Sequence, residues 1–226
     1  MISAIHKADW KAVKALLFDF DGVIVESVDI KTQAFAKLFE DYGEDVVKKV
    51  TAHHVLHGGI SRFEKIKFYH KAYVGREIDT GELGIWCKRF SDIVLDSVIK
   101  APLVPGVLDF FKKTSGKFSC FIVSGTPQEE LELILEKRAL SRYFRKAYGS
   151  PSSKKEIIGN IISSDALHPD EMIYYGDSLS DYDASVATGV YFIGRVPKDT
   201  NNPFPMNTET IKDFTTYLEN FETGSS

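Results

Sequence analysis

Short apolar runs alternate with segments of helical spacing over much of the chain. Continuous apolar runs of this length are typical of strands covered on both faces, and four occur: VKALLFDF (13–20), KFSCFIVS (117–124), EMIYYGD (171–177) and GVYFIG (189–194). Apolar residues at helical spacing and helix-start signals predict helices over 127–140, 154–162 and 180–187. Strands that alternate with helices indicate βαβ units, so the pattern predicts an α/β fold with a parallel sheet.

Residues 28–102 break this alternation. Their pattern is helical nearly throughout and contains no convincing strand. The proline-marked segment PLVPGV (102–107) then leads back to the alternating pattern. We therefore expect two domains: a core domain of residues 1–27 and 103–226, and a helical domain of residues 28–102 inserted after the first strand.

Composition and charge narrow the class of protein. Among the 226 residues, 43% are apolar and 27% charged, which is ordinary for a soluble globular protein. The net charge is −4 without a basic tract, so we expect no binding to nucleic acid or to a membrane. No apolar run is long enough for a membrane span, and charges interrupt the N-terminal stretch where a signal peptide would be apolar. Cys87 and Cys120 are too few for a disulfide framework, so we expect a cytoplasmic protein with reduced thiols.

Polar residues collect where the predicted strands end. They are Asp19 and Asp21 after the first strand, Ser124 and Gly125 after the second, Lys154 and Lys155 at the start of the following helix, and Asp177 and Asp181 after the third strand. Ligands of open parallel sheets bind beyond the carboxyl ends of the strands. We therefore expect four carboxylates, a hydroxyl and at least one ammonium group to converge at one edge.

Several carboxylates at one site need a cation to offset their repulsion and burial. Oxygen ligands of high negative charge suit Mg²⁺, which keeps waters or substrate phosphate as its other ligands. The lysine and the backbone amides after Ser124 suit a dianionic phosphate. One carboxylate beside that phosphate can be a nucleophile, and a second can exchange protons with the leaving oxygen and with water.

Four motifs in this order, FDFDGV, VSGT, a lysine at a helix start and GDSLSD, resemble those of the haloacid dehalogenase (HAD) superfamily of aspartyl-phosphate-forming enzymes. The chain is most similar to the branch with a helical cap after the first motif, which holds phosphoglycolate-phosphatase-like and β-phosphoglucomutase-like enzymes. The resemblance covers nearly the whole chain. It implies a HAD-like three-layer core around a parallel sheet, with residues 28–102 as the cap.

The resemblance also implies a role for each motif residue. Asp19 would be the nucleophile, and Asp21 would be the general acid and base. Ser124 and the Gly125 amide would donate hydrogen bonds to the phosphoryl group, and Lys154 would neutralise its charge. The Mg²⁺ site would consist of Asp19, Asp21, Asp177 and Asp181, with the backbone carbonyl of Asp21 as a ligand and Asp181 holding a metal-bound water or orienting the lysine. Lys154 is preferred to Lys155 because Lys-x-Glu-Ile-Ile matches the helix start of the family. An aspartate at position 21 argues for phosphate-ester chemistry, since the dehalogenases and the phosphonate-cleaving members lack it.

The segment HGGISRFEKIK (57–67) resembles a cap loop that closes over the site and reads the substrate. Its glycines give the backbone freedom, and Arg62 is a candidate to grip a carboxylate or a distal phosphate. Arg62 and the pair Lys88-Arg89 could each face either the site or solvent, and the sequence leaves this open.

The predicted function is a Mg²⁺-dependent phosphatase that acts on a small phosphorylated metabolite, as a monomer or a homodimer. The alternative is a β-phosphoglucomutase-like sugar phosphomutase, which the Gly59–Arg62 run favours. Such mutases carry a histidine ten residues after the general acid, and this chain has Lys31 there, which favours the phosphatase. A non-catalytic binding protein is the third possibility, but so costly an acidic cluster argues against it.

Overall fold

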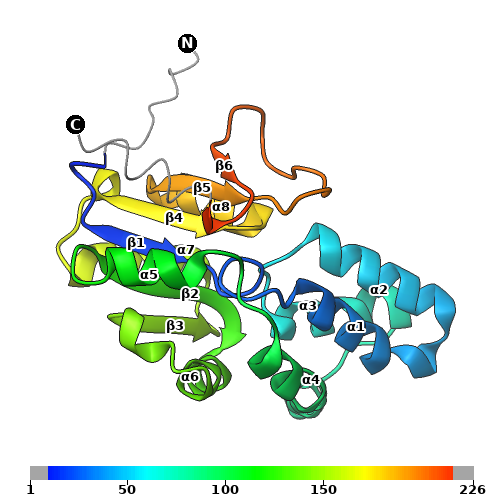
Figure 1. Cartoon of the computed structure of the whole chain (residues 1–226). Helices are drawn as coiled ribbons and strands as arrows, with labels where there is room; N and C mark the ends of the chain where they lie inside the picture. The colour runs from blue at the N-terminus through cyan, green and yellow to red at the C-terminus, as the bar shows by residue number, and fades with distance from the viewer. Residues whose placement is uncertain (1–9, 216–226) are drawn as a thin grey trace.

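A six-stranded parallel sheet forms the centre of the molecule in the computed structural model, which describes residues 10–215. The strand order is β3-β2-β1-β4-β5-β6, and Figure 1 shows the strands running side by side. Their bounds are β1 (Ala15–Phe18), β2 (Ser119–Pro127), β3 (Lys146–Ser150), β4 (Met172–Gly176), β5 (Tyr191–Arg195) and β6 (Thr210–Ile211). The prediction of an α/β fold with a parallel sheet is confirmed.

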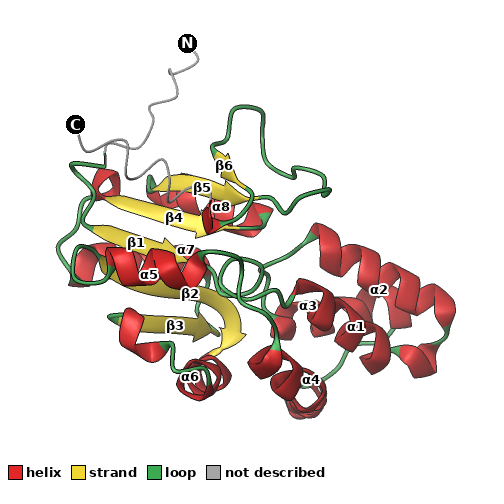
Figure 2. Cartoon of the chain, in the orientation of Figure 1, coloured by secondary structure: helices red, strands yellow, loops and turns green. Residues whose placement is uncertain are grey.

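Helices cover both faces of the sheet. Alternate residues of β1 point to opposite faces, and all four are apolar, so each face needs a layer of helices to bury it. Leu16 and Phe18 pack with one set of buried side chains, and Ala15 and Leu17 pack with another. The first set includes α5 (Val107–Thr114) and α6 (Gln128–Lys137); the second includes α7 (Lys154–Ser164) and α8 (Leu179–Thr188). In Figure 2, α5 lies in front of the sheet and α8 behind it. The result is a three-layer sandwich with an apolar core on each side.

The sequence pattern located the four strands nearest the middle of the sheet and missed the two at its edges. β3 begins with the exposed Lys146, and Ala147 and Tyr148 are only half buried. β6 has two residues, of which one is exposed. An edge strand is covered less than a central one, so its sequence lacks the continuous apolar run by which the others were found.

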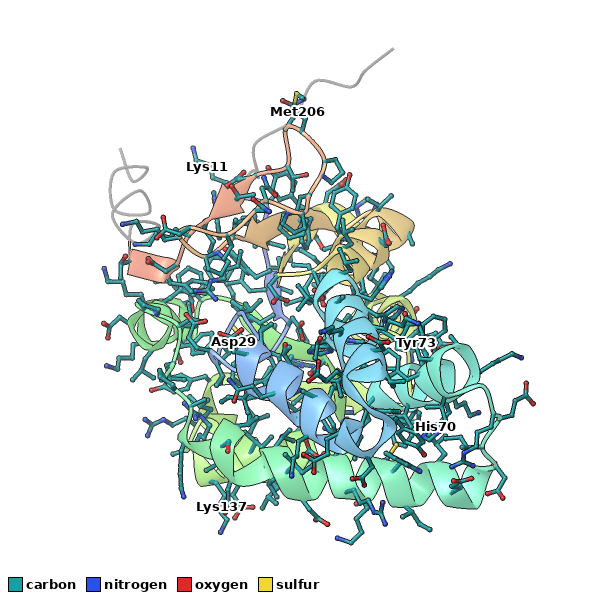
Figure 3. All side chains as sticks on the ribbon, turned by 90° about the vertical axis from the view of Figure 1, so that its right-hand side faces the viewer. Lys11, Asp29, His70, Tyr73, Lys137 and Met206 are labelled. Carbon is teal, nitrogen blue, oxygen red and sulfur yellow. The ribbon has the colours of Figure 1, made fainter. Side chains whose placement is uncertain are left out.

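A helical segment, residues 28–100, follows the first strand and the loop after it. It consists of α1 (Val28–Leu38), a 3-10 turn (Glu40–Tyr42), α2 (Glu44–Leu56), α3 (Arg62–Tyr69), a π-helical stretch η2 (His70–Val74) and α4 (Thr80–Lys100). Figures 1 and 2 show these helices grouped beyond one end of the sheet strands, and Figure 3 looks onto them from that side. Aromatic side chains hold them together: Phe35 contacts Tyr69 and Phe90, and Phe39 stacks on Trp86. The segment contains no strand, as the pattern predicted, while its status as a separate domain stays a prediction.

The remaining elements are two 3-10 turns, Ser141–Tyr143 and Pro169–Glu171. Figure 3 places Met206 at the tip of the long loop between β5 and β6, on a different side of the molecule from His70 and Tyr73. Between residues 10 and 215, none of the helices combines the length and apolar character that crossing a membrane requires.

Candidate active site

Asp19 lies directly after β1, at the carboxyl end of the sheet, and is 2% exposed. Its Oδ1 accepts a hydrogen bond from the Phe20 N–H at 2.7 Å, and its Oδ2 lies 2.9 Å from Lys154 Nζ. Burial raises the pKa of the Asp19 carboxyl to about 7; the Lys154 charge opposes this, and the neighbouring carboxylates add to it. Asp19 is thus a buried carboxylate oriented by one amide and one ammonium group.

Lys154 is the first residue of α7, and a local signal fixes where that helix begins. Ser153 caps it: its hydroxyl accepts from the Glu156 N–H at 3.3 Å, and the Glu156 carboxylate accepts from the Ser153 N–H at 2.8 Å. The Lys154 ammonium bridges Asp19 and Asp181, with 2.6 Å to the latter. Burial disfavours its charged form, but the charges of Asp181 and Asp19 outweigh burial and raise the pKa of Lys154. The structure therefore brings Lys154 to Asp19, whereas Lys155 is exposed.

Asp181, in the first turn of α8, is fully buried and has every oxygen engaged. Its Oδ1 accepts from Lys154 and from the Tyr174 hydroxyl, and its Oδ2 accepts from the Ser178 N–H at 3.2 Å and the Ser178 hydroxyl at 2.5 Å. A carboxylate held by four donors has one orientation available. Its main effect in this geometry is to position the Lys154 ammonium against Asp19.

Asp177 completes a group of three carboxylates. One oxygen from each of Asp19, Asp177 and Asp181 lies within 4.8 Å of the others. Burial and then the negative charges of Asp19 and Asp181 raise the pKa of Asp177 well above its usual range. Gly22 permits this packing, because a Cβ there would overlap the Asp177 carboxylate. An oxygen-only set that is short of positive charge fits a hard divalent cation.

Asp21 points to a different set of partners. Its carboxylate accepts from the Ser27 hydroxyl at 2.6 Å, the Thr126 hydroxyl at 3.0 Å and the Lys31 ammonium at 2.5 Å. Burial favours its neutral form, but the Lys31 charge and these hydrogen bonds outweigh burial and lower the pKa of Asp21. The sequence had marked Lys31 only as the replacement of a histidine. Its spacing of ten residues from Asp21, at the start of a helix, was the signal that it belongs to the site.

Ser124 and Gly125 lie on β2, beside β1. Ser124 is 1% exposed, and its hydroxyl oxygen accepts from the Thr126 N–H at 3.1 Å, so its hydroxyl hydrogen is free to point elsewhere. Gly125 lines the cavity over the site and touches the helical segment, since a Cβ on it would lie 2.6 Å from the Gly59 carbonyl oxygen.

A cavity of about 740 Å³ lies between the sheet edge and the helical segment. Asp19, Asp21 and Asp177 line one side, and Gly58 and Gly59 contribute to the other. The loop of Gly58 and Gly59 lies directly on Lys154, Ser178 and Ser180. A Cβ on Gly59, which has φ +75°, would lie 2.7 Å from Lys154 Nζ and from Ser178 Oγ, and the Ser180 hydroxyl donates to the Gly58 carbonyl at 2.9 Å.

The cationic residues suggested for substrate contact have partners of their own. Arg62 is 4% exposed and pairs with the carboxylate of Glu130 on α6, at 2.6 and 2.8 Å, and with the Ser91 hydroxyl at 2.5 Å. Lys88 is exposed and pairs with Asp92, and Arg89 lies over the Trp86 ring. Arg62 lines the cavity, and its contact with substrate stays a prediction.

Residues 16–195 match the family model of the haloacid dehalogenase-like hydrolases. The chain belongs to this family. A curated relative, phosphoglycolate phosphatase 1 of Pseudomonas aeruginosa, is 23% identical in an alignment 201 residues long that covers 78% of this chain and 67% of that protein. The phosphoglycolate phosphatase of Synechococcus elongatus is 21% identical and matches over 79% of this chain and 81% of its own length.

The fold of this haloacid dehalogenase-like hydrolase is also that of solved structures. A β-phosphoglucomutase from Clostridium difficile superposes with a TM-score of 0.73 over 94% of this chain and 98% of that one, at 16% identity. The predicted family, a helical-cap member of the haloacid dehalogenase superfamily, and the predicted class, an enzyme that hydrolyses its substrate, are therefore confirmed.

Proposed function

We propose that this enzyme is a Mg²⁺-dependent phosphatase that hydrolyses small phosphoric monoesters through an aspartyl-phosphate intermediate. One observation carries the proposal: the buried Asp19 carboxylate is fixed against Lys154, beside Asp177, at the base of a cavity of small-molecule size. Phosphoryl transfer depends mainly on positioning and charge neutralisation, and this arrangement supplies both.

Each residue has a role in this chemistry. The Asp19 carboxylate attacks the phosphorus atom, the bond between phosphorus and the leaving oxygen breaks, and Asp21 gives that oxygen a proton. Water then attacks the aspartyl-phosphate, Asp21 accepts a proton from it, and inorganic phosphate and the free Asp19 carboxylate result. Ser124 and the Gly125 amide donate to the phosphoryl oxygens, and Lys154 offsets their charge.

Asp19 and Asp177, with the backbone carbonyl of Asp21, would hold Mg²⁺, and Asp181 would hold Lys154 and a water of the ion. The bound ion would supply positive charge to the three-carboxylate group and to the phosphoryl oxygens. The raised pKa values of Asp19 and Asp177 support this assignment, since they mark a site that lacks positive charge.

The Lys31–Asp21 ion pair favours the phosphatase over the phosphomutase. Once Asp21 has given its proton to the leaving oxygen, Lys31 stabilises the ionised form that results, and this form takes a proton from the attacking water. We further propose that the helical segment acts as a cap, because its glycine loop covers Lys154 and would exclude bulk water from the intermediate during the first step. A small phosphorylated metabolite as partner, a cytoplasmic location and a monomeric or homodimeric state stay predictions.

The test is release of inorganic phosphate from p-nitrophenyl phosphate and from a panel of phosphorylated metabolites. We expect turnover with Mg²⁺ and none with EDTA. Asp19→Asn should lose at least about 10⁴-fold in kcat, as expected for loss of a nucleophile. Asp183→Asn, an exposed aspartate of α8, is the control and should keep its activity. Unchanged turnover in Asp19→Asn would refute the mechanism, and isomerisation of glucose 1-phosphate faster than phosphate release would favour the mutase.

A further inference from the structure

Lys65 on α3 is buried in the helical segment and lines the cavity, with 2% of its surface exposed. Its ammonium lies 2.8 Å from His54 Nδ1 and 5.9 Å from the centre of the Phe35 ring. Among residues 10–215, no carboxylate oxygen lies within 4.0 Å of it. Burying an ammonium group without a counter-charge is energetically unfavourable, so an anion bound next to Lys65 would stabilise its charge.

The other buried cations around the cavity differ from Lys65 in this respect. Lys154 pairs with two carboxylates, Lys31 with Asp21, Arg62 with Glu130, and Arg195 with Glu26. Their charges are satisfied inside the protein. Among these five cations, Lys65 alone has only a neutral imidazole as its partner, because burial and then the Lys65 charge lower the pKa of His54 to about 3.

Electrostatics show that Lys65 is part of the same site. Burial and then the charges of Lys31 and Lys154 lower the pKa of Lys65 to about 7, while Asp177 and Asp21 act in the opposite direction. Groups that shift the pKa of one another in this way share one low-dielectric space. An anion bound against Lys65 would therefore restore its charged form and would be held strongly.

We propose that Lys65, oriented by His54, binds a second anionic group of the substrate, a carboxylate or a phosphate separate from the phosphoryl group that Asp19 attacks. This inference rests on the proposed function. The transferred phosphoryl group already has Lys154, Ser124 and the Gly125 amide as partners. Among the cations compared above, only Lys65 is left without a carboxylate partner to bind a second anionic group. The substrate class is then phosphorylated acids or bisphosphates rather than phosphate esters of neutral alcohols.

The experiment compares matched substrates in three proteins. The substrates are phosphorylated ω-hydroxy acids of two to five carbons, beginning with 2-phosphoglycolate, and the phosphorylated diols of equal length. The proteins are wild type, Lys65→Met and Lys67→Met, the last being an exposed lysine of the same helix. For at least one chain length we expect wild type to prefer the acid by tenfold or more in kcat/KM. Lys65→Met should lose that preference and keep its rate on the diol within about twofold, and Lys67→Met should resemble wild type.

Two outcomes would overturn the inference while leaving the phosphatase intact. The first is turnover of both substrate series without preference for the acids. The second is an equal loss on acid and diol in Lys65→Met, which would mean that Lys65 contacts the transferred phosphoryl group or only supports the fold. Calorimetry can test the subsite even if no turnover occurs. It measures the affinity of each acid and its diol for Asp19→Asn and for the double variant that also carries Lys65→Met. Loss of acid binding in the double variant supports the subsite, and equal binding of acid and diol to Asp19→Asn refutes it.

Discussion

The two walls of the cavity use charge in opposite ways. On the sheet wall, Asp19, Asp21 and Asp181 are each held by a lysine and by further hydrogen-bond donors. On the helical wall, Lys65 is buried against a neutral histidine. The difference shows how a site can divide its work. The groups proposed to do chemistry are fixed in advance by partners within the protein, while the group proposed to recognise the substrate is left for the substrate to complete.

The sheet wall should be the more sensitive of the two to loss of a cation. Lys154→Met removes the lysine that contacts Asp19 and leaves the buried Asp181 without its ion pair. We expect kcat to fall by about 10³-fold or more, since a single preorganised donor contributes about 10²–10³. The matched control is Lys155→Met, which changes an exposed neighbour and should stay within about twofold of wild type in steady-state kinetics. The reverse order of effects would assign the catalytic lysine to position 155.

A variant of Arg62 tests whether this cation of the helical wall stabilises the fold or binds the substrate. Arg62→Met leaves Glu130 buried without its partner, and breaking such a pair costs about 3–5 kcal/mol of unfolding free energy. The exposed pair Arg76–Glu82 supplies the control, because Arg76→Met should cost at most about 1 kcal/mol. Denaturant unfolding measures both values. Equal and small costs would contradict a structural role, and loss of the preference for anionic substrates in a stable Arg62→Met would transfer the recognition role from Lys65 to Arg62.

Close contact between the two walls is tested at Gly59. Gly59→Ala would place a Cβ 2.2 Å from Ser180 Oγ and 2.7 Å from Lys154 Nζ, so either the loop or these side chains must shift. A displacement of this size at catalytic groups costs about 10²-fold in rate. Gly75→Ala is the control, since Gly75 has a similar φ of +83° but a Cβ added there would have nothing within 4 Å. Both variants place alanine at a similar positive φ. An equal fall of kcat/KM in the two variants would therefore show that the Gly59 contact has no catalytic consequence.

The sequence located the sheet wall better than the helical wall, for a physical reason. Parallel strands deliver their carboxyl ends to one edge, so Asp19 and Asp177 could be placed together from strand pattern alone. Lys31 and Lys65 lie on helices, and their partners depend on how α1 and α3 pack against the site. Nothing in the spacing of Lys65 and His54 shows that one accepts a hydrogen bond from the other. For the same reason the sequence did not predict the ion pair of Arg62 with Glu130, which are far apart in the chain.

The smallest predicted effect concerns pH and bears directly on the contrast between the walls. The pKa of Lys65 is lowered to about 7, so in the free enzyme its ammonium is mostly charged below pH 7 and mostly neutral above it. Only the charged form attracts a second anionic group, and a bound anion raises the pKa of Lys65, which moves the transition to higher pH in the complex. The ratio of kcat/KM for a phosphorylated acid to that for its diol should therefore fall about tenfold between pH 6 and pH 9.

The ratio isolates Lys65 because ionisation of the shared phosphate group affects both substrates alike. Other charged groups face the same space, and they too act on both members of the pair: Lys31 from α1, Lys154 from α7, Asp21 after β1 and Asp177 after β4. His54 is neutral throughout, since its pKa is about 3. In Lys65→Met the ratio should be low and independent of pH. A ratio that stays constant in wild type would contradict the prediction for Lys65. A ratio that keeps its pH dependence in Lys65→Met would show that the titrating group is a residue other than Lys65.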